Sequence, residues 1–329
     1  MIESSSTPTS PASYRRVFMV LSSRSLSYAQ FSLRSLFHNS SEPIHLHLIT
    51  DSQADKNALV EELTLRQNPG RHLWSVYGED ELADREASLF DQYPNLRLFR
   101  HGHPCWRKIT DPVLLSKKDS EEMIVVDPDV YFPNRFCFET TPNTGVLLMW
   151  QKPNCLVPSQ TVRAAMDKGI RFAHHVDIGV AAWREPIDLE WLEWLLIQLN
   201  IRSLRHIMHI EAIVWSALAM RIGGGYLDPN LWHCWRRSQP KRILRKLGFP
   251  GVHLLRTEDF SGMKCFHAGG EAKWWLAEAK LRGILDRQND RTSPGKIYPF
   301  EELIPDNYYR EQRMKNILGK MGYYSMFRT

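Results

Sequence analysis

Residues 122–132 read EMIVVDPDVYF, an apolar run that ends in two aspartates one residue apart. Residues 123–126 carry no polar side chain, which is typical of a strand buried on both faces. Pro128 fixes φ between Asp127 and Asp129 and so limits their geometry. Two carboxylates this close disfavour each other's ionisation unless a cation compensates. The stretch predicts a buried strand that ends either at a divalent-metal site or at a turn capped by aspartates.

Upstream of this strand the hydrophobic pattern switches repeatedly between strand and helix. Strands are predicted by the apolar run VFMVL and by the alternating run IHLHLIT, each followed by a helical pattern, and a third strand is expected after them. The strands are expected at 17–21, 44–50 and 73–77, and the helices near 31–37 and from Lys56. This order predicts an α/β fold with a mainly parallel, Rossmann-like mixed sheet flanked by helices.

Ligands of such sheets bind at the carboxyl ends of the strands. Ser22, Ser23 and Asp51 follow the first two predicted strands. We therefore expect these three residues in the binding site, together with the two aspartates.

Beyond the aspartates the pattern continues with strands and helices. Strands are expected at 145–150 and 177–183, and helices at 189–199 and 211–220, the second ended by three glycines at 223–225. Residues from Phe266 onward predict a loop, with a helical run from Trp274.

Composition places the chain among ordinary globular proteins, with 43% hydrophobic and 24% charged residues over 329 positions. The net charge of +5 is mild, and we expect no nucleic-acid partner. The excess is concentrated in residues 235–246, which contain six Arg and Lys residues and no acid. This block is either a solvated helix face or a site for an anionic partner.

The five cysteines include no CxxC pair, which argues against a disulfide framework and a structural zinc site and favours a cytoplasmic location. No apolar run is long enough for a membrane span. Residues 1–13 are rich in Ser, Thr and Pro and predict a disordered lead-in, not a signal peptide.

A second motif lies far downstream, where His267, Gly270, Lys273 and Trp275 have the spacing H-x-x-G-x-x-K-x-W. A neutral histidine is a metal ligand, a glycine allows close approach to a phosphate, and a lysine neutralises a diphosphate. Each residue alone is unremarkable, but the four together indicate a phosphate-binding loop.

The order of these motifs resembles the GT-A glycosyltransferases, and within them the family of glycogenin and the bacterial lipopolysaccharide galactosyltransferases. The resemblance spans about residues 14–276 at the level of motifs. It implies that Asp127, Asp129 and His267 bind Mn²⁺ or Mg²⁺, and that Lys273 binds the donor diphosphate. Gly270 is expected beside that diphosphate because a glycine allows the backbone to approach a phosphate closely. The family has Pro before the final Trp, where this chain has Trp274.

Three further positions are implied by the same resemblance. Asp177 in DIGV matches a family Asn or Asp that contacts the donor sugar, and Lys108 matches a basic residue that touches the nucleotide, with Arg107 as its competitor. Glu211 stands near the family's D-Q pair but lacks the amide. If Glu211 acts on the substrate, it is a base, a nucleophile-like stabiliser or an acceptor of a hydrogen bond from a sugar hydroxyl. Otherwise it is an acidic residue that the helix dipole favours at a helix N-terminus.

The resemblance implies a metal-dependent transfer of a hexose from a nucleotide sugar, a UDP-sugar, to a glycan, glycolipid or other acceptor hydroxyl. It favours retention, but the missing D-Q pair leaves open an inverting reaction with a carboxylate base opposite the leaving group. One alternative is a GT-A protein that binds nucleotide or glycan without catalysis. The other is a haloacid-dehalogenase-like phosphatase, whose first motif has the same pattern but normally opens its domain.

Three parts of the chain are expected: the lead-in of residues 1–13, a GT-A catalytic domain of residues 14–285, and a helical tail of residues 286–329. The domain would divide into a nucleotide-binding half, 14–135, and an acceptor half, 136–285. Tryptophans 232, 235, 274 and 275 are candidates for an acceptor groove or for the core.

The tail contains a helical repeat of apolar residues accompanied by basic ones. The apolar set is Met314, Ile317, Leu318 and Met321, and the basic set is Arg310, Arg313, Lys315 and Lys320. Such a helix either packs on the protein or lies on an anionic membrane. In the second case the chain would sit at the inner face of the membrane and its acceptor would be a lipid-linked glycan.

Overall fold

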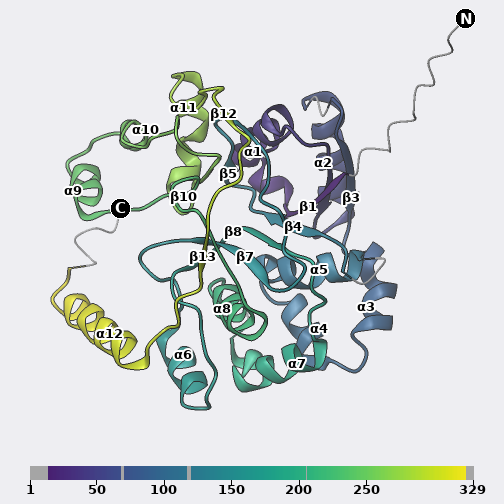
Figure 1. Cartoon of the computed structure of the whole chain (residues 1–329), viewed down its shortest axis with the longest axis vertical. Helices are drawn as coiled ribbons and strands as arrows, with labels where there is room; N and C mark the ends of the chain where they lie inside the picture. Colours follow the sequence, from purple (N-terminus) through teal and green to yellow (C-terminus); the bar gives the residue numbers. More distant parts are fainter. Residues whose placement is uncertain (1–13, 68–69, 117–119, 205, 324–329) are drawn as a thin grey trace, which may run out of the picture.

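A mixed eight-stranded sheet runs through the described part of the chain (Figure 1). The computed structural model describes residues 14–67, 70–116, 120–204 and 206–323. The predicted lead-in of residues 1–13 and the last six residues of the predicted tail lie outside these ranges. From edge to edge the strands are β13 (Ile297–Pro299), β9 (Gly224–Leu227), β7 (Val146–Trp150), β8 (Val176–Trp183), β4 (Met123–Val126), β1 (Arg15–Val20), β2 (Ile44–Ile49) and β3 (Leu73–Tyr77).

The sheet is mainly parallel, as the sequence predicts. β4, β1, β2 and β3 are mutually parallel neighbours, and β7 is parallel to β9. β8 runs antiparallel to both β4 and β7, and β13 antiparallel to β9. The first residues of β8 therefore lie at the same edge of the sheet as the carboxyl ends of β4 and β1.

Both faces of the sheet are covered, which explains the uninterrupted apolar run of β4. Met123 and Val125 belong to one hydrophobic core, and Ile124 and Val126 belong to another. Successive side chains of a strand point to opposite faces, so each face of β4 enters its own core. The same alternation places Phe18 of β1 in the first core.

Helices α1 (Leu26–Asn39) and α2 (Gln53–Leu65) contribute to the second of these cores. The first is covered by α4 (Pro94–Arg100), α5 (Arg107–Leu115), α7 (Leu189–Gln198) and α8 (Ile210–Ile222), with α3 (Ala83–Leu89) and α6 (Ser159–Met166) beside them. In Figure 1 α1 and α2 lie across the sheet from α6, α7 and α8. The predicted α/β architecture is thus confirmed.

Two small sheets complete the strands. β10 (Trp232–Cys234), β11 (Cys265–His267) and β5 (Val130–Tyr131) form one, and β12 (Asp290–Arg291) pairs with β6 (Arg135–Phe136) in the other. Phe266 and His267 are therefore in a strand, where the sequence predicts a loop. The turn begins after His267, and a 3₁₀ turn, Ala272–Trp275, leads into α11 (Leu276–Leu281).

The C-terminal segment is helical only in part. After residue 286 the chain first adds β12 and β13, and the helix expected for the tail is α12 (Pro305–Lys320). Met314, Ile317 and Met321 of its apolar set are 56%, 48% and 75% exposed. Within the described ranges, none of the helices combines the length and apolarity needed to cross a bilayer.

Two further helices, α9 (Gln239–Lys246) and α10 (Gly251–Leu255), lie between β10 and β11. α9 carries much of the basic block predicted at residues 235–246. Part of that block is already paired, since Lys241 bonds Glu258 and Arg245 lies 3.5 Å from Glu271.

Candidate active site

The carboxyl ends of β1, β2, β4 and β7 open into one pocket of about 430 Å³. Residues just beyond three of these ends, Ser22, Asp51 and Asp127, line it, as does Gln151 after β7. Asp177, the second residue of β8, enters from the opposite strand direction. The topology thus gathers polar side chains from distant parts of the sequence at one sheet edge.

His267 reaches the aspartates through the pairing of β11 with β5. In that antiparallel pair His267 lies opposite Val130, the residue that follows Asp129. The Ala268 amide donates to the Asp129 carbonyl at 2.9 Å. His267 Nε2 lies 3.3 Å from Asp129 Oδ1 and 3.7 Å from Asp127 Oδ2.

These three side chains fit a divalent cation. One ligand atom from each lies within 4.8 Å of the other two. Ligands at right angles around an ion with bonds of about 2.1 Å would be about 3 Å apart, so small side-chain movements complete the geometry. Two carboxylate oxygens and one imidazole nitrogen are a donor set that suits Mn²⁺.

Asp177 holds the histidine in the orientation such a site needs. Its Oδ1 lies 2.7 Å from His267 Nδ1 and also accepts from the Gly179 amide at 2.8 Å. A proton held on Nδ1 leaves Nε2 as the nitrogen that faces the aspartates. Burial opposes the protonated imidazole, but Asp177 and Asp129 outweigh it and raise the pKa of His267 well above its ordinary value.

Gly179 makes this contact sterically feasible. A Cβ at this position would lie 2.6 Å from His267 Nδ1 and 2.7 Å from its Cγ. The register of β7 against β8 shifts beside it, between Leu148 and Met149. Such irregularities re-aim side chains next to functional sites.

Lys108 bridges two carboxylates deeper in the pocket. It lies in the first turn of α5, with Nζ 2.5 Å from Asp127 Oδ1 and 2.8 Å from Glu211 Oε1. Burial raises the pKa of Glu211 to about 8 although Lys108 acts to lower it, and burial likewise raises the pKa of Asp127. Both carboxylates are therefore costly to ionise without more positive charge than Lys108 supplies.

The balance of charge points the same way. Asp51 is left aside because it pairs with Arg107. Among the described residues, the pocket is then lined by two lysines, Lys108 and Lys273, and by four carboxylates, those of Asp127, Asp129, Asp177 and Glu211. With all four carboxylates ionised and His267 neutral, as it is when it binds a metal, the formal sum is −2, that is −4 plus +2, which one divalent cation cancels. Without a cation the raised pKa values of His267 and Glu211 reduce this charge by proton uptake.

The predicted phosphate loop lies on the rim of the pocket. Gly270 has φ of +66° and nothing within 4 Å of where a Cβ would be, so its backbone is open to a ligand. Lys273 Nζ lies 3.8 Å from Asp129 Oδ2 and 5.0 Å from the centre of the Tyr28 ring. Ser23 does not line the pocket, and its amide bonds Asp55 instead.

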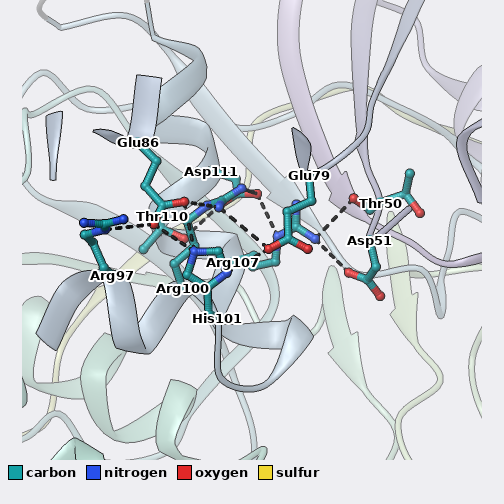
Figure 2. Close-up of polar contacts among 10 residues, drawn as sticks. All are labelled: Thr50, Asp51, Glu79, Glu86, Arg97, Arg100, His101, Arg107, Thr110 and Asp111. Carbon is teal, nitrogen blue, oxygen red and sulfur yellow. Dashed lines mark hydrogen bonds and ion pairs between the residues drawn. The ribbon is translucent and has the colours of Figure 1, made fainter. Parts of the chain in front are cut away.

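Asp51 is fixed by a buried network behind the pocket (Figure 2). Arg107 donates to Asp51 Oδ1 at 2.7 Å and to Asp111 Oδ2 at 2.8 Å. Asp111 also accepts from Arg100 at 2.8 Å, and Arg100 pairs with Glu86. Of the two competing basic residues, Lys108 therefore faces the pocket and Arg107 positions Asp51.

Sequence reasoning missed Gln151, Tyr28 and Gly179. Gln151 directly follows a predicted strand, so the strand-end rule that selected Asp51 could have found it. Tyr28 lies within α1, where an aromatic residue indicates only core packing. Gly179 was part of the DIGV pattern, but its steric role depends on His267, 88 positions later.

The tryptophans divide between core and surface. Trp232 is fully buried and donates to Glu139, so it belongs to the core and not to an acceptor groove. Trp274 is 59% exposed and packs edge-on against Tyr28 beside the pocket.

No protein-family model matches this chain, and no curated protein matches it. Among solved structures it is similar to mouse xyloside xylosyltransferase 1 in its apo form, with 12% identity over 79% of this chain and 98% of that chain, at a TM-score of 0.49. It is also similar to the galactosyltransferase LgtC in complex with donor and acceptor sugar analogues, with 12% identity over 84% and 98% of the two chains and a TM-score of 0.43. An active-site mutant of LgtC has 13% identity over 84% and 98%, with a TM-score of 0.44. At these identities and TM-scores the likeness does not extend to an activity, which has to be inferred from the side chains.

Proposed function

We propose that this protein is a metal-dependent glycosyltransferase that transfers a hexose from a nucleotide sugar, a UDP-sugar, to an acceptor hydroxyl. The observation that supports it most is the convergence of Asp127, Asp129 and His267 beside a second cationic group, Lys273. A diphosphate leaving group needs positive charge where its negative charge develops.

Asp127, Asp129 and His267 would hold Mn²⁺ or Mg²⁺. Such an ion, when bound, acts as a Lewis acid on the departing diphosphate. Lys273 supplies a positive charge at the rim, and the open backbone at Gly270 accommodates a phosphate oxygen. Asp177 positions His267, a role that differs from the sugar contact implied by the resemblance.

Lys108 and Glu211 form the inner wall. Lys108 restrains Asp127 and Glu211 in one place, so that the carboxylate of Glu211 faces the pocket from the first turn of α8. From there Glu211 can accept a hydroxyl proton from the sugar or stabilise positive charge on its ring. Ser22 and Asp51 line the end of the pocket formed by β1 and β2, where we place the nucleoside.

The acceptor is proposed to be a glycan or glycolipid. Trp274 offers an exposed aromatic face beside the pocket, and such faces stack on sugar rings. The exposed apolar residues of α12, with Arg313 and Lys320 on the same helix, support contact with an anionic membrane. Flotation with anionic and neutral vesicles tests this, and absence of binding to anionic vesicles would remove it.

A thermal-shift panel tests the donor proposal. Nucleoside diphosphates and their sugars are added with and without Mn²⁺, and release of nucleoside diphosphate is then measured with the stabilising donors. We expect UDP to stabilise the protein only with Mn²⁺, and a UDP-sugar to be turned over. Stabilisation without turnover would favour the binding-only alternative, and hydrolysis of a generic phosphomonoester the phosphatase. Retention stays a prediction that NMR of the first-formed product can decide.

A further inference from the structure

A pair of adjacent histidines meets a glutamate from the C-terminal segment outside the candidate active site. His174 and His175 immediately precede β8, and Glu301 follows β13. One ring nitrogen of each histidine and a carboxylate oxygen of Glu301 lie within 4.8 Å of one another. The imidazole rings stack with centroids 3.6 Å apart, and the His174 amide donates to the Glu301 carbonyl at 2.7 Å. Main chain and side chains thus hold the three groups together.

The two imidazoles have polar atoms without partners. His174 Nε2 and His175 Nδ1 are buried, and neither has a hydrogen-bond partner among the described residues. Buried nitrogens left unsatisfied are costly. His175 also has φ of +57°, a conformation that non-glycine residues rarely adopt. Costs of this kind persist where a further interaction offsets them.

The histidines are in the state that a metal ligand requires. Burial, aided by the neighbouring His174 and Lys152, lowers the pKa of His175 to about 4, and burial also lowers the pKa of His174. Both rings are neutral near pH 7, so a metal need not displace a proton from them. Glu311 adds negative charge nearby, while Lys152 and Lys315 oppose a cation.

We propose that His174, His175 and Glu301 bind Zn²⁺, with water in a fourth position. Two imidazoles and one carboxylate are a donor set found at zinc sites, whereas the oxygen-rich set at Asp127 and Asp129 suits Mn²⁺. The lack of CxxC pairs argued against a structural zinc site in the sequence, but this site uses no cysteine.

The bound ion would link the segment between β13 and α12, which carries Glu301, to the residues that precede β8. Glu301 connects β13 to α12, and its neighbour Glu302 already forms a bridge with Ala173 and an ion pair with Arg171. His175 lies two residues before Asp177, which forms a hydrogen bond with His267. Zinc would therefore stabilise both the start of β8 and the segment that carries α12.

The test uses the full chain carrying Asp127→Asn, Asp129→Asn and His267→Ala. These changes remove ligands from the two other candidate metal groups among the described residues, the group of Asp127, Asp129 and His267 and the group of Asp177, Cys234 and His267. Zn²⁺ affinity is measured by competition with a chromophoric chelator, and Co²⁺ is added to record its visible absorption. We expect one equivalent of Zn²⁺ and Co²⁺ bands typical of nitrogen and oxygen ligands. Glu301→Gln should weaken Zn²⁺ binding by at least roughly tenfold, and His175→Asn should abolish it.

Glu302→Gln is the matched control, since it removes a neighbouring carboxylate outside the cluster, and it should bind Zn²⁺ as the parent does. Asn is chosen at position 175 because it tolerates a positive φ. Glu301 is exposed, so Glu301→Gln should fold, and it decides the test even if His175→Asn does not fold. A parent chain that binds no Zn²⁺, or a folded Glu301→Gln chain with parental affinity, would overturn the proposal.

Discussion

Gly179→Ala tests the packing that places His267 over the aspartates. The added Cβ would lie 2.6 Å from His267 Nδ1, and ordinary contact begins near 3.4 Å, so the imidazole must retreat by about 0.8 Å. It would also lie 3.0 Å from Asp177 Oδ1. The new methyl group therefore presses on both members of the pair that orients Nε2.

Losing the support behind a metal-binding histidine typically lowers metal affinity 10- to 100-fold, and about 1 Å of misplacement costs roughly 100-fold in rate. We expect Mn²⁺ affinity, measured by isothermal calorimetry with UDP present, to fall by 10- to 100-fold in Gly179→Ala. Overpacking should also destabilise the fold by about 1–3 kcal/mol, visible in thermal unfolding.

Gly78→Ala is the control, because its Cβ would meet nothing closer than Glu81 Oε2 at 3.6 Å. It should leave Mn²⁺ affinity unchanged. If Gly179→Ala is folded and binds Mn²⁺ as tightly as the unmodified chain, then His267 does not depend on this contact and the geometric reasoning is wrong.

Three further predictions concern the buried charges around the pocket. Arg107→Met leaves Asp111 without one of its two arginines and should destabilise the fold by about 3–5 kcal/mol, measured by thermal unfolding. Arg171→Met, which removes an exposed ion pair, is the control and should barely change the midpoint. Equal unfolding midpoints for the two variants would contradict this prediction. Burial disfavours ionised Glu86, but His101 and Arg100 outweigh it and lower its pKa below the ordinary 4.5. Its stabilising contribution is therefore fully present above pH 4.5 and lost as pH falls through the lowered pKa. Glu86→Gln should therefore weaken the pH dependence of stability on the acid side of pH 4.5, and an unchanged slope there would count against it. Lys108→Met removes the ion-pair partner of Asp127 and Glu211 and should lower the unfolding midpoint. Adding Mn²⁺ should raise the midpoint of this variant more than it raises that of the unmodified chain. A smaller rise would contradict the idea that Lys108 and the metal both neutralise Asp127.

Most of the sheet was predictable because its strands bury both faces. A strand such as β4 must be apolar throughout, and such a run is short, local and visible in the sequence. Once β1, β2 and β4 were located in the sequence, their carboxyl ends were located too. The residues that follow those ends are Ser22, Asp51 and Asp127. The alternating run of β2 was equally clear.

The strand character of Phe266 and His267 was not predictable in the same way. β11 has three residues, and its pairing with β5 depends on a partner more than a hundred positions away. Glycines after His267 predict a loop, and the loop does begin there. The β13 addition to the sheet edge was hidden for a similar reason, since its residues are exposed and show no apolar pattern.

Within the site, residue types were more predictable than their partners. The spacing of the late motif selected His267, Gly270 and Lys273, which line the pocket. No pattern indicated that Asp177 bonds His267, or that Lys108 joins Asp127 to Glu211. Those contacts arise from the antiparallel direction of β8 and from the first turns of α5 and α8, which only the three-dimensional arrangement brings together.

The central claim is most directly tested by measuring Mn²⁺ binding in the presence of UDP, for the unmodified chain and for Asp129→Asn and His267→Ala. We predict that the unmodified chain binds Mn²⁺ and UDP cooperatively, and that each substitution weakens Mn²⁺ binding by at least roughly tenfold while the protein remains folded. UDP binding that is indifferent to Mn²⁺, or substituted chains that bind Mn²⁺ as the unmodified chain does, would contradict it.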